Sequence, residues 1–203
     1  MQDRFIGRLI LGIGLIAIMV MPAAAQEAEG DMGLDSAMMA NWAKFATPGE
    51  NHAHFQKMVG KWTASSTFWM GPDAPEMTSE GTAEFEVIFG GRYLVQHYQG
   101  EFMGDIFHGM GITAYDNFRQ EYIDIWLDDM GTAIMLTRGK SNEAGTEFTY
   151  IGKMDDPLSD RKDIPTRTVA RVVDSETHML EMFTVDLEGK EFKSMEIIYK
   201  RAE

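Results

Sequence analysis

The hydrophobic pattern of the chain changes within Phe55-Gln56-Lys57-Met58-Val59-Gly60-Lys61-Trp62. Up to Val59 the apolar residues recur at helical spacing, and from Trp62 onward they alternate with polar residues as in a β-strand. We therefore expect a short helix over residues 50–59 and a first strand that begins at residue 61. This stretch marks the entrance to a strand-rich region that continues almost to the C-terminus.

The region after Trp62 divides into about ten alternating segments separated by turn residues. The expected strands cover residues 61–70, 82–89, 92–102, 106–115, 121–127, 132–140, 146–154, 166–173, 178–185 and 191–200. Only residues 155–165 form a long expected loop, and no connection has room for a crossover helix, so the sheet should be antiparallel. The sequence therefore predicts an all-β, antiparallel up-and-down barrel with a short N-terminal helical arm, and a β-sandwich is the alternative.

The N-terminal residues have the composition of a secretory leader. Arg4 and Arg8 precede an apolar run over residues 9–21, and the small residues Ala23 and Ala25 suit cleavage after Ala25. The run is shorter than the roughly 20 residues of a membrane span, although an uncleaved anchor is the alternative. We expect a signal peptide at 1–25, an acidic, partly helical arm at 26–49 and a barrel domain at 50–203. The protein should then be periplasmic or secreted, with no stable membrane span after cleavage.

Composition excludes several classes of function. The chain has 203 residues, a net charge of −14 and no cysteine. Disulfides, thiolate metal sites and cysteine nucleophiles are therefore excluded. The acidic balance argues against nucleic acid as a partner, because phosphate binding needs clustered Lys and Arg. His52 and His54 diverge if residues 50–59 are helical, so no metal site and no cofactor are predicted.

Gly60-Lys61-Trp62 at the entrance of the first strand is similar to the signature of lipocalins and of the wider calycin group. In that group the tryptophan seals one barrel end, and a basic residue near the last strand packs across its ring. The resemblance implies that Gly60, Trp62 and Arg201 (or Lys200) close one end of the barrel. Any binding mouth should then lie at the opposite end.

A longer set of short sequence segments resembles a bacterial family of exported domains of unknown function with a calycin-like, lipocalin-like barrel. The resemblance covers about residues 50–201 and implies a fold but no catalytic residues. At residues 118–120, Phe-Arg-Gln stands where a glycine is expected in the turn. The segments that carry the resemblance are His52 with residues 59–62, Gly81-Thr82-Ala83, residues 89–94, Gly109-Met110-Gly111, Tyr115-Asp116-Asn117, Trp126-Leu127-Asp128 and residues 193–197.

Polar side chains inside otherwise apolar strands are the candidates for ligand contact. A charge on the inner face of a barrel must be paired or must face a wet cavity. We therefore predict ligand-binding roles for Tyr98, Trp126, Arg167, Glu181 and His97, with Arg167 and Glu181 forming a pair across adjacent strands. The 17 methionines suit an adaptable apolar lining.

Together these features favour a protein that binds a small apolar or amphipathic molecule inside its barrel. One alternative is a small-molecule isomerase or hydrolase that uses Asp124 or Glu181 with His97 as an acid–base pair. A second is a haem-binding barrel with His97, His108 or His178 as the axial ligand. A third is an interaction module that acts through the acidic arm or an exposed apolar patch. The sequence contains no Gly-x-Ser-x-Gly motif and assigns no catalytic residue.

The leader generates a direct prediction. The exported protein should begin at Gln26, because Ala25 is the small residue that precedes the predicted cleavage site. Intact-mass measurement of the protein recovered from the producing cells checks this. A mass that includes residues 1–25 would support the uncleaved anchor instead.

Overall fold

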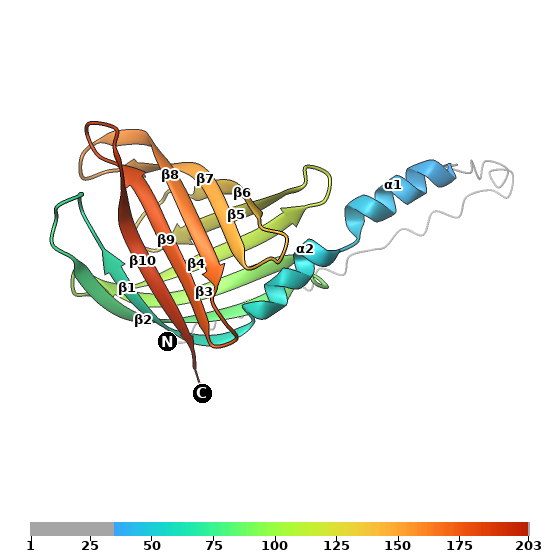
Figure 1. Ribbon diagram of the computed structural model, residues 1–203, viewed down its shortest axis with the longest axis horizontal. Helices are drawn as coiled ribbons and strands as arrows, with labels where there is room; N and C mark the ends of the chain where they lie inside the picture. The colour runs from blue at the N-terminus through green and yellow to red at the C-terminus, as the bar shows by residue number, and fades with distance from the viewer. Residues whose placement is uncertain (1–34, 203) are drawn as a thin grey trace, which may run out of the picture. The chain divides into compact units, whose positions relative to one another are not determined.

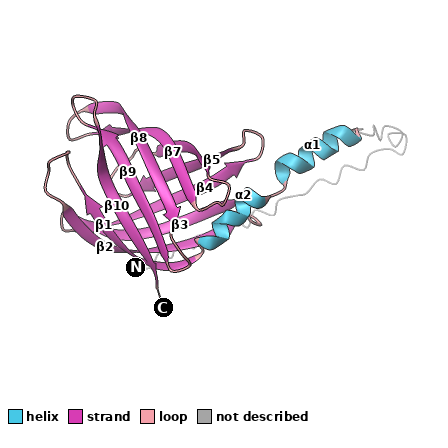
Figure 2. Ribbon diagram, in the orientation of Figure 1, coloured by secondary structure: helices cyan, strands magenta, loops and turns pink. Residues whose placement is uncertain are grey.

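The computed structural model describes residues 35–202. The chain divides into two compact units, Met1–Met39 and Ala40–Glu203, and the second unit contains the barrel. Figure 1 shows the strands in chain order, and Figure 2 shows that strands make up most of this unit. They are β1 Gly60–Phe68, β2 Met77–Ile88, β3 Tyr93–Phe102, β4 Asp105–Asp116, β5 Glu121–Asp128, β6 Met135–Ser141, β7 Glu147–Asp156, β8 Arg161–Val172, β9 Thr177–Val185 and β10 Glu191–Arg201.

Each strand pairs antiparallel with its neighbours in the sequence, and β1 pairs with β10 to close the barrel. In that closing pair Trp62 lies opposite Arg201, and Phe68 lies opposite Met195. The predicted all-β, antiparallel up-and-down barrel is thereby confirmed, and the sandwich alternative is wrong. Closure leaves no sheet edge unpaired, which is the usual way that antiparallel sheets of this size avoid edge-to-edge association.

Alternation along each strand divides the side chains between the interior and the outer face. In β1 the buried residues are Trp62, Ala64 and Ser66, while Thr63 and Ser65 between them are exposed. The same period of two continues through Ala83 and Phe85 of β2. The core of the molecule is therefore the inside of the barrel.

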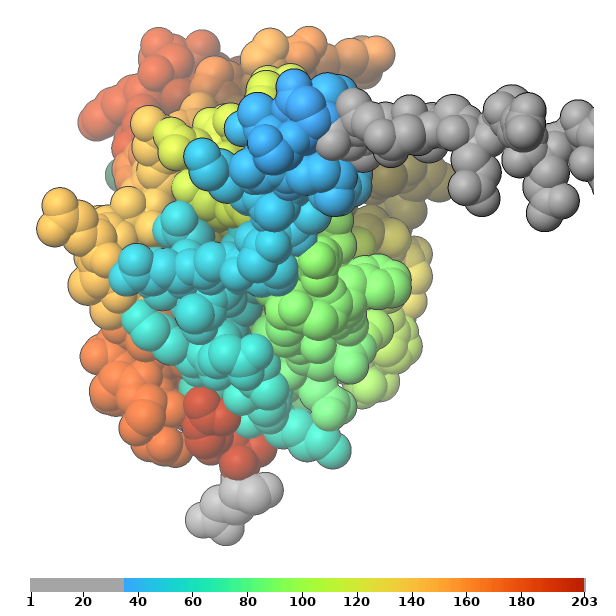
Figure 3. Space-filling view, turned by 90° about the vertical axis from the view of Figure 1, so that its right-hand side faces the viewer, coloured from blue at the N-terminus to red at the C-terminus, as the bar shows by residue number. Residues whose placement is uncertain are grey.

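The helical segment just before β1 covers one end of the barrel. The described helices are α1 Ser36–Ala46, α2 Glu50–Ala53 and the 3₁₀-helix η2 His54–Lys57. The segment of α2 and η2, drawn in cyan, lies across this barrel end in Figure 3. Phe55 is 3% exposed and its ring packs against Tyr122, 6.2 Å between centroids. Burial of this aromatic residue joins the helical segment to the strands.

Trp62, His178 and Arg201 meet at the same end. Trp62 is 1% exposed, its Nε1 donates to the Met58 carbonyl at 2.8 Å, and the Arg201 guanidinium lies 4.2 Å from its ring centroid. Arg201 Nη1 also donates to the Val59 carbonyl at 3.0 Å. The imidazole of His178 packs edge-on against the indole, 4.3 Å between centroids. This cluster fixes the first and last strands to the connection that enters the barrel.

The strand boundaries differ from expectation most clearly at the predicted loop 155–165. β7 continues to Asp156 through an irregularity after Met154, and β8 already begins at Arg161. Pro165 signalled a loop, yet it lies within β8 opposite Lys153. The carbonyl of Pro165 faces β9, and the backbone nitrogen of the same residue points to the same side. The β8–β9 ladder begins only at Arg167, so the N–H that proline lacks is not needed for strand pairing.

The turn that lacks the expected glycine also forms. Gln120 takes the left-handed conformation with φ 55°, and its N–H donates to the Asp116 carbonyl at 2.7 Å. The Asp116 carboxylate accepts from the N–H groups of Phe118 and Arg119 at 2.8 and 3.0 Å. The aspartate therefore supplies the local hydrogen bonds that stabilise this turn.

Several expectations concern residues that the structure does not describe. The predicted signal peptide at 1–25 and the first part of the arm at 26–49 lie outside residues 35–202. Among the described residues, no helix has both the length and the hydropathy that a membrane crossing requires.

Gly60 offers a test of the closed end. Its φ of +125° is left-handed, and a Cβ added there would lie 2.8 Å from Arg201 Nη1. Gly60→Ala should therefore lower the free energy of unfolding by about 1–3 kcal/mol, measured by urea denaturation. Gly71→Ala is the matched control, because a Cβ there meets nothing within 4 Å. Equal stability of the two variants would contradict a strained entrance to β1.

Candidate functional site

The barrel encloses a cavity of about 650 Å³. Its walls are mostly apolar and rich in methionine and aromatic residues, with a few polar groups on the inner faces of β3, β4, β5 and β7 to β10. This volume and lining are typical of sites for one small organic molecule. The apolar lining residues include Met58, Phe68, Phe85, Leu94, Phe102, Phe107, Met135, Phe148, Met154, Ala170, Leu180, Met182, Met195 and Ile197.

The cavity is exposed at the end opposite Trp62. Met130 and Ile134, from the loop between β5 and β6, line it and are 55% and 65% exposed. At the other end Phe55 and Trp62 are almost fully buried. A molecule therefore has a direct route into the cavity past the loops that follow β5 and β7.

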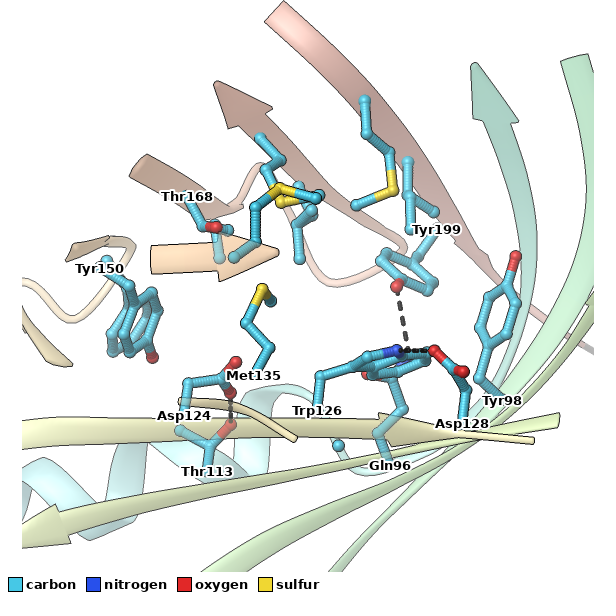
Figure 4. A pocket seen from close by; sticks show the side chains of 18 of the residues that line it. Gln96, Tyr98, Thr113, Asp124, Trp126, Asp128, Met135, Tyr150, Thr168 and Tyr199 are labelled. Carbon is cyan, nitrogen blue, oxygen red and sulfur yellow. Dashed lines mark hydrogen bonds between the residues drawn. The ribbon is translucent and has the colours of Figure 1, made fainter. Parts of the chain in front are cut away.

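Two aromatic rings occupy space that glycines leave free. A Cβ on Gly109 would lie 2.2 Å from the Trp126 ring, and one on Gly100 would lie 2.6 Å from the Tyr98 ring. The two rings stand 6.0 Å apart between centroids. Small residues on β3 and β4 thus position Tyr98 and Trp126 at the cavity wall (Figure 4).

Most polar groups of the wall are paired with one another. Gln96 Nε2 donates to the Tyr199 hydroxyl at 3.1 Å, and Trp126 Nε1 donates to Asp128 Oδ2 at 2.8 Å. Figure 4 shows both bonds across the cavity wall. Burial raises the pKa of Tyr199, so its hydroxyl stays protonated. These pairs orient the wall but leave little unused hydrogen-bonding capacity.

Asp124 on β5 differs from these groups. Its Oδ1 accepts from Thr113 Oγ1 at 2.7 Å, and no other residue among 35–202 donates to its carboxylate. Burial raises the pKa of Asp124 to about 6, and the Thr113 hydrogen bond acts in the opposite direction. The accessible part of its surface faces the cavity inside the barrel. Asp124 is therefore a carboxyl group available to a molecule inside the barrel.

Two hydroxyl groups accompany Asp124. The Tyr150 ring lies beside it in Figure 4, and burial, followed by the nearby Asp124 charge, raises the tyrosine pKa well above its usual range. Thr168, opposite Tyr150 in the β7–β8 pair, is 8% exposed. Its Oγ1 has no hydrogen-bond partner among the described residues, which is uncommon for a buried hydroxyl.

The structure separates the five predicted ligand residues into two groups. Tyr98 and Trp126 line the cavity. His97, Arg167 and Glu181 lie on the outer face, because they occupy the other parity of their strands. The interior placement expected for these three polar side chains is therefore wrong.

The outer-face charges also pair differently from expectation. Arg167 binds Glu191, with Nε to Oε1 at 3.0 Å, and its guanidinium stacks 4.0 Å from the Phe183 centroid. Glu181 binds Arg171 instead and also accepts from Lys193 at 3.3 Å. The predicted Arg167–Glu181 pair is replaced by this network across β7 to β10.

The residues of the acid–base alternative do not come together in the structure. His97 is 53% exposed on the outer face and lies 3.6 Å from Glu86, whereas Asp124 faces the cavity. Glu181 also lies on the outer face. Neither predicted carboxylate meets His97, so the named pair does not form.

None of the three histidines predicted as a haem ligand presents a free ring nitrogen to the cavity. His97 is exposed, and His108 lies on the surface, where it binds Asp129 at 3.0 Å. His178 is 1% exposed with both ring nitrogens sealed, and burial lowers its pKa to about 4. Within residues 35–202 no group of three His, Asp or Glu side chains is arranged to hold a metal ion.

Sequence reasoning missed Tyr150, Thr168 and Tyr199 as cavity residues, and considered Asp124 only as an acid or base. A usable signal was present for Asp124. Trp126 was expected inside, and a residue two positions away on a strand shares the same face. For the other three residues, the hydroxyl groups resemble ordinary strand residues, and only the closed barrel brings them together.

Comparison with known proteins agrees with this geometry. The chain belongs to the family described as "Protein of unknown function (DUF1579)", which matches residues 47–201, so the predicted membership of a family of unknown function is confirmed. No curated protein sequence matches at a significant level.

Two solved structures share the fold. Rv2717c from M. tuberculosis is similar at a TM-score of 0.57 and 11% identity, over 77% of this chain and 100% of that one. The S-type phycobiliprotein lyase CPES from Guillardia theta is similar at a TM-score of 0.52 and 10% identity, over 77% of this chain and 99% of that one. At these identities the likeness is one of fold alone.

Asp124 and His178 should give opposite pH dependences of stability. The folded pKa of Asp124 is raised from 3.8 to about 6, so its contribution is complete below pH 3.8 and is lost as the pH rises through 6. The folded pKa of His178 is lowered from 6.5 to about 4, so its contribution is complete above pH 6.5 and is lost as the pH falls through 4. Each effect should reach about 3 kcal/mol, and in the wild-type protein they largely cancel.

Two substitutions separate the effects in urea unfolding measured from about pH 4 to pH 7. Asp124→Asn should be more stable than wild type near neutral pH, because an unpaired buried charge is removed, and this gain should vanish near pH 4. His178→Leu should lose stability as the pH rises over the same range. Parallel pH profiles for both variants and wild type would contradict the assignments.

Proposed function

We propose that this protein binds one small apolar or amphipathic molecule inside its barrel. The observation that carries the proposal is the cavity of about 650 Å³ with its methionine and aromatic lining. Apolar surface of this extent favours a ligand with an apolar body, because its transfer from water is favourable. The few polar groups, among which Asp124 accepts a single hydrogen bond from a described residue, suit a ligand with a polar end.

The fold family agrees with this function without specifying it. The family is one of unknown function, and the two similar structures share the fold; one of them is a phycobiliprotein lyase by name. For this chain we infer binding rather than chemistry, because the predicted acid–base pair does not form. Export to the periplasm or the medium is part of the proposal, and its support is the sequence of residues 1–25 alone.

A neutral fluorescent probe, N-phenylnaphthylamine, tests the proposal. The protein should bind it saturably with one site per chain, and the fluorescence should be enhanced because the probe leaves water. Ala170→Trp should weaken binding by about tenfold or more, since the indole would fill part of the cavity that Ala170 lines. Titration at fixed protein concentration gives both quantities.

Ile151→Trp is the matched control. Ile151 is 56% exposed on the outer face of β7, so the same side chain there should leave probe binding unchanged. Absence of saturable binding by wild type would refute the proposal. Equal binding by the two tryptophan variants would show that the probe binds outside the barrel.

A further inference from the structure

Asp124 places an anionic group inside a chamber that is otherwise mostly apolar. Its only hydrogen bond from a described residue is the one from Thr113, and no cation pairs with it there. An ionised carboxylate in such surroundings is costly unless a cation or several donors compensate it. The chain retains the group at a position where part of its surface faces the cavity.

Other carboxylates that line the cavity are already engaged. Asp128 accepts from Trp126 Nε1 at 2.8 Å and from the Met130 N–H at 3.1 Å. Asp163 binds Lys153 at 3.1 Å near the mouth. Asp155 accepts from the Asp163 N–H at 2.9 Å and is exposed to solvent. Asp124 is therefore the carboxylate of the inner wall whose remaining partner must come from the contents of the cavity.

Cations of the protein do not reach Asp124. Lys153 is held by Asp163, and Arg171 is held by two glutamates of the outer face. Burial lowers the pKa of His54 and of His178, so both imidazoles are neutral at physiological pH. No compensating charge is thus supplied by the lining itself.

The groups around Asp124 favour a polar head with hydrogen-bond donors. Tyr150 and Tyr199 both have pKa values raised by burial, with the Asp124 charge adding to the effect, so they remain neutral hydroxyls. Thr168 also lines the cavity, with its Oγ1 buried and without a partner among residues 35–202. Met135 lies close to Asp124 in Figure 4 and gives apolar contact beside the carboxylate.

We propose that Asp124 holds the ammonium head of an amphipathic amine whose apolar body lies along the methionine and aromatic wall. The proposal rests on the ligand-binding function above and names its substrate class. An ammonium group compensates the carboxylate and can donate to the Tyr150 hydroxyl as well. A fatty acid of equal length would place two carboxylates together, which is unfavourable at low dielectric.

The charge of the whole molecule favours the same class. The chain carries a net charge of −14, and Asp128, Asp155 and Asp163 lie along the cavity wall. A field of this sign concentrates cations at the mouth and repels anions.

Displacement of bound N-phenylnaphthylamine by decylamine, decanol and decanoate at about pH 8 tests the proposal, since Asp124 is then ionised. Wild type should prefer decylamine over decanol, and decanol over decanoate, by about tenfold at each step. In Asp124→Asn the preference for decylamine over decanol, taken as a ratio within that variant so that any change in probe affinity cancels, should fall to about threefold or less.

Asp129→Asn is the control, because it removes the same charge from a surface carboxylate that binds His108 outside the cavity. The Asp129→Asn variant should keep the wild-type order of preference, with decylamine before decanol and decanol before decanoate. Equal displacement by the three compounds, or an amine preference that survives in Asp124→Asn, would overturn the head-group assignment while leaving the ligand-binding function intact. Failure of all three compounds to displace a saturably bound probe would overturn it too. Failure of the probe itself to bind would instead refute the proposed function.

Discussion

Antiparallel pairing of β1 with β10 is the constraint on which the rest of the structure depends. Without it a meander of ten strands has two free edges and an apolar face open to water. With it the inner faces converge, and the period of two along every strand becomes a division between interior and exterior. The interior is wide enough that side chains line it without filling it, and a cavity remains.

The two ends of the barrel differ because the chain enters at only one of them. At that end η2 places Phe55 over the strands, and Arg201 stacks on Trp62 while it binds the Val59 carbonyl. Contacts that stabilise closure therefore also seal the cavity there. The opposite end is left to the connecting loops, which tolerate exposure, so access to the interior follows from how the barrel is closed.

Asp124 carries a cost in stability that the proposed ligand would offset. A packed apolar residue there would avoid the burial of a charge. The barrel instead supplies one hydrogen bond from Thr113 and leaves the rest of the carboxylate to the cavity. Strained or destabilising groups of this kind are common at binding sites, where the ligand completes the interactions that the protein lacks. The pairing of the other wall groups isolates this one as the polar end of the site.

The sequence by itself determined the fold, because alternation and turn residues are local signals: the ten strands, their antiparallel order and the entrance at Trp62 were all predictable. Parity also implied that Asp124 shares the face of Trp126. Only the tertiary structure decided which strands' residues meet. Register and closure place Arg167 against Glu191 on the outer face, and bring Tyr150 beside Asp124 inside. Such contacts depend on the stagger between strands, which no single strand encodes.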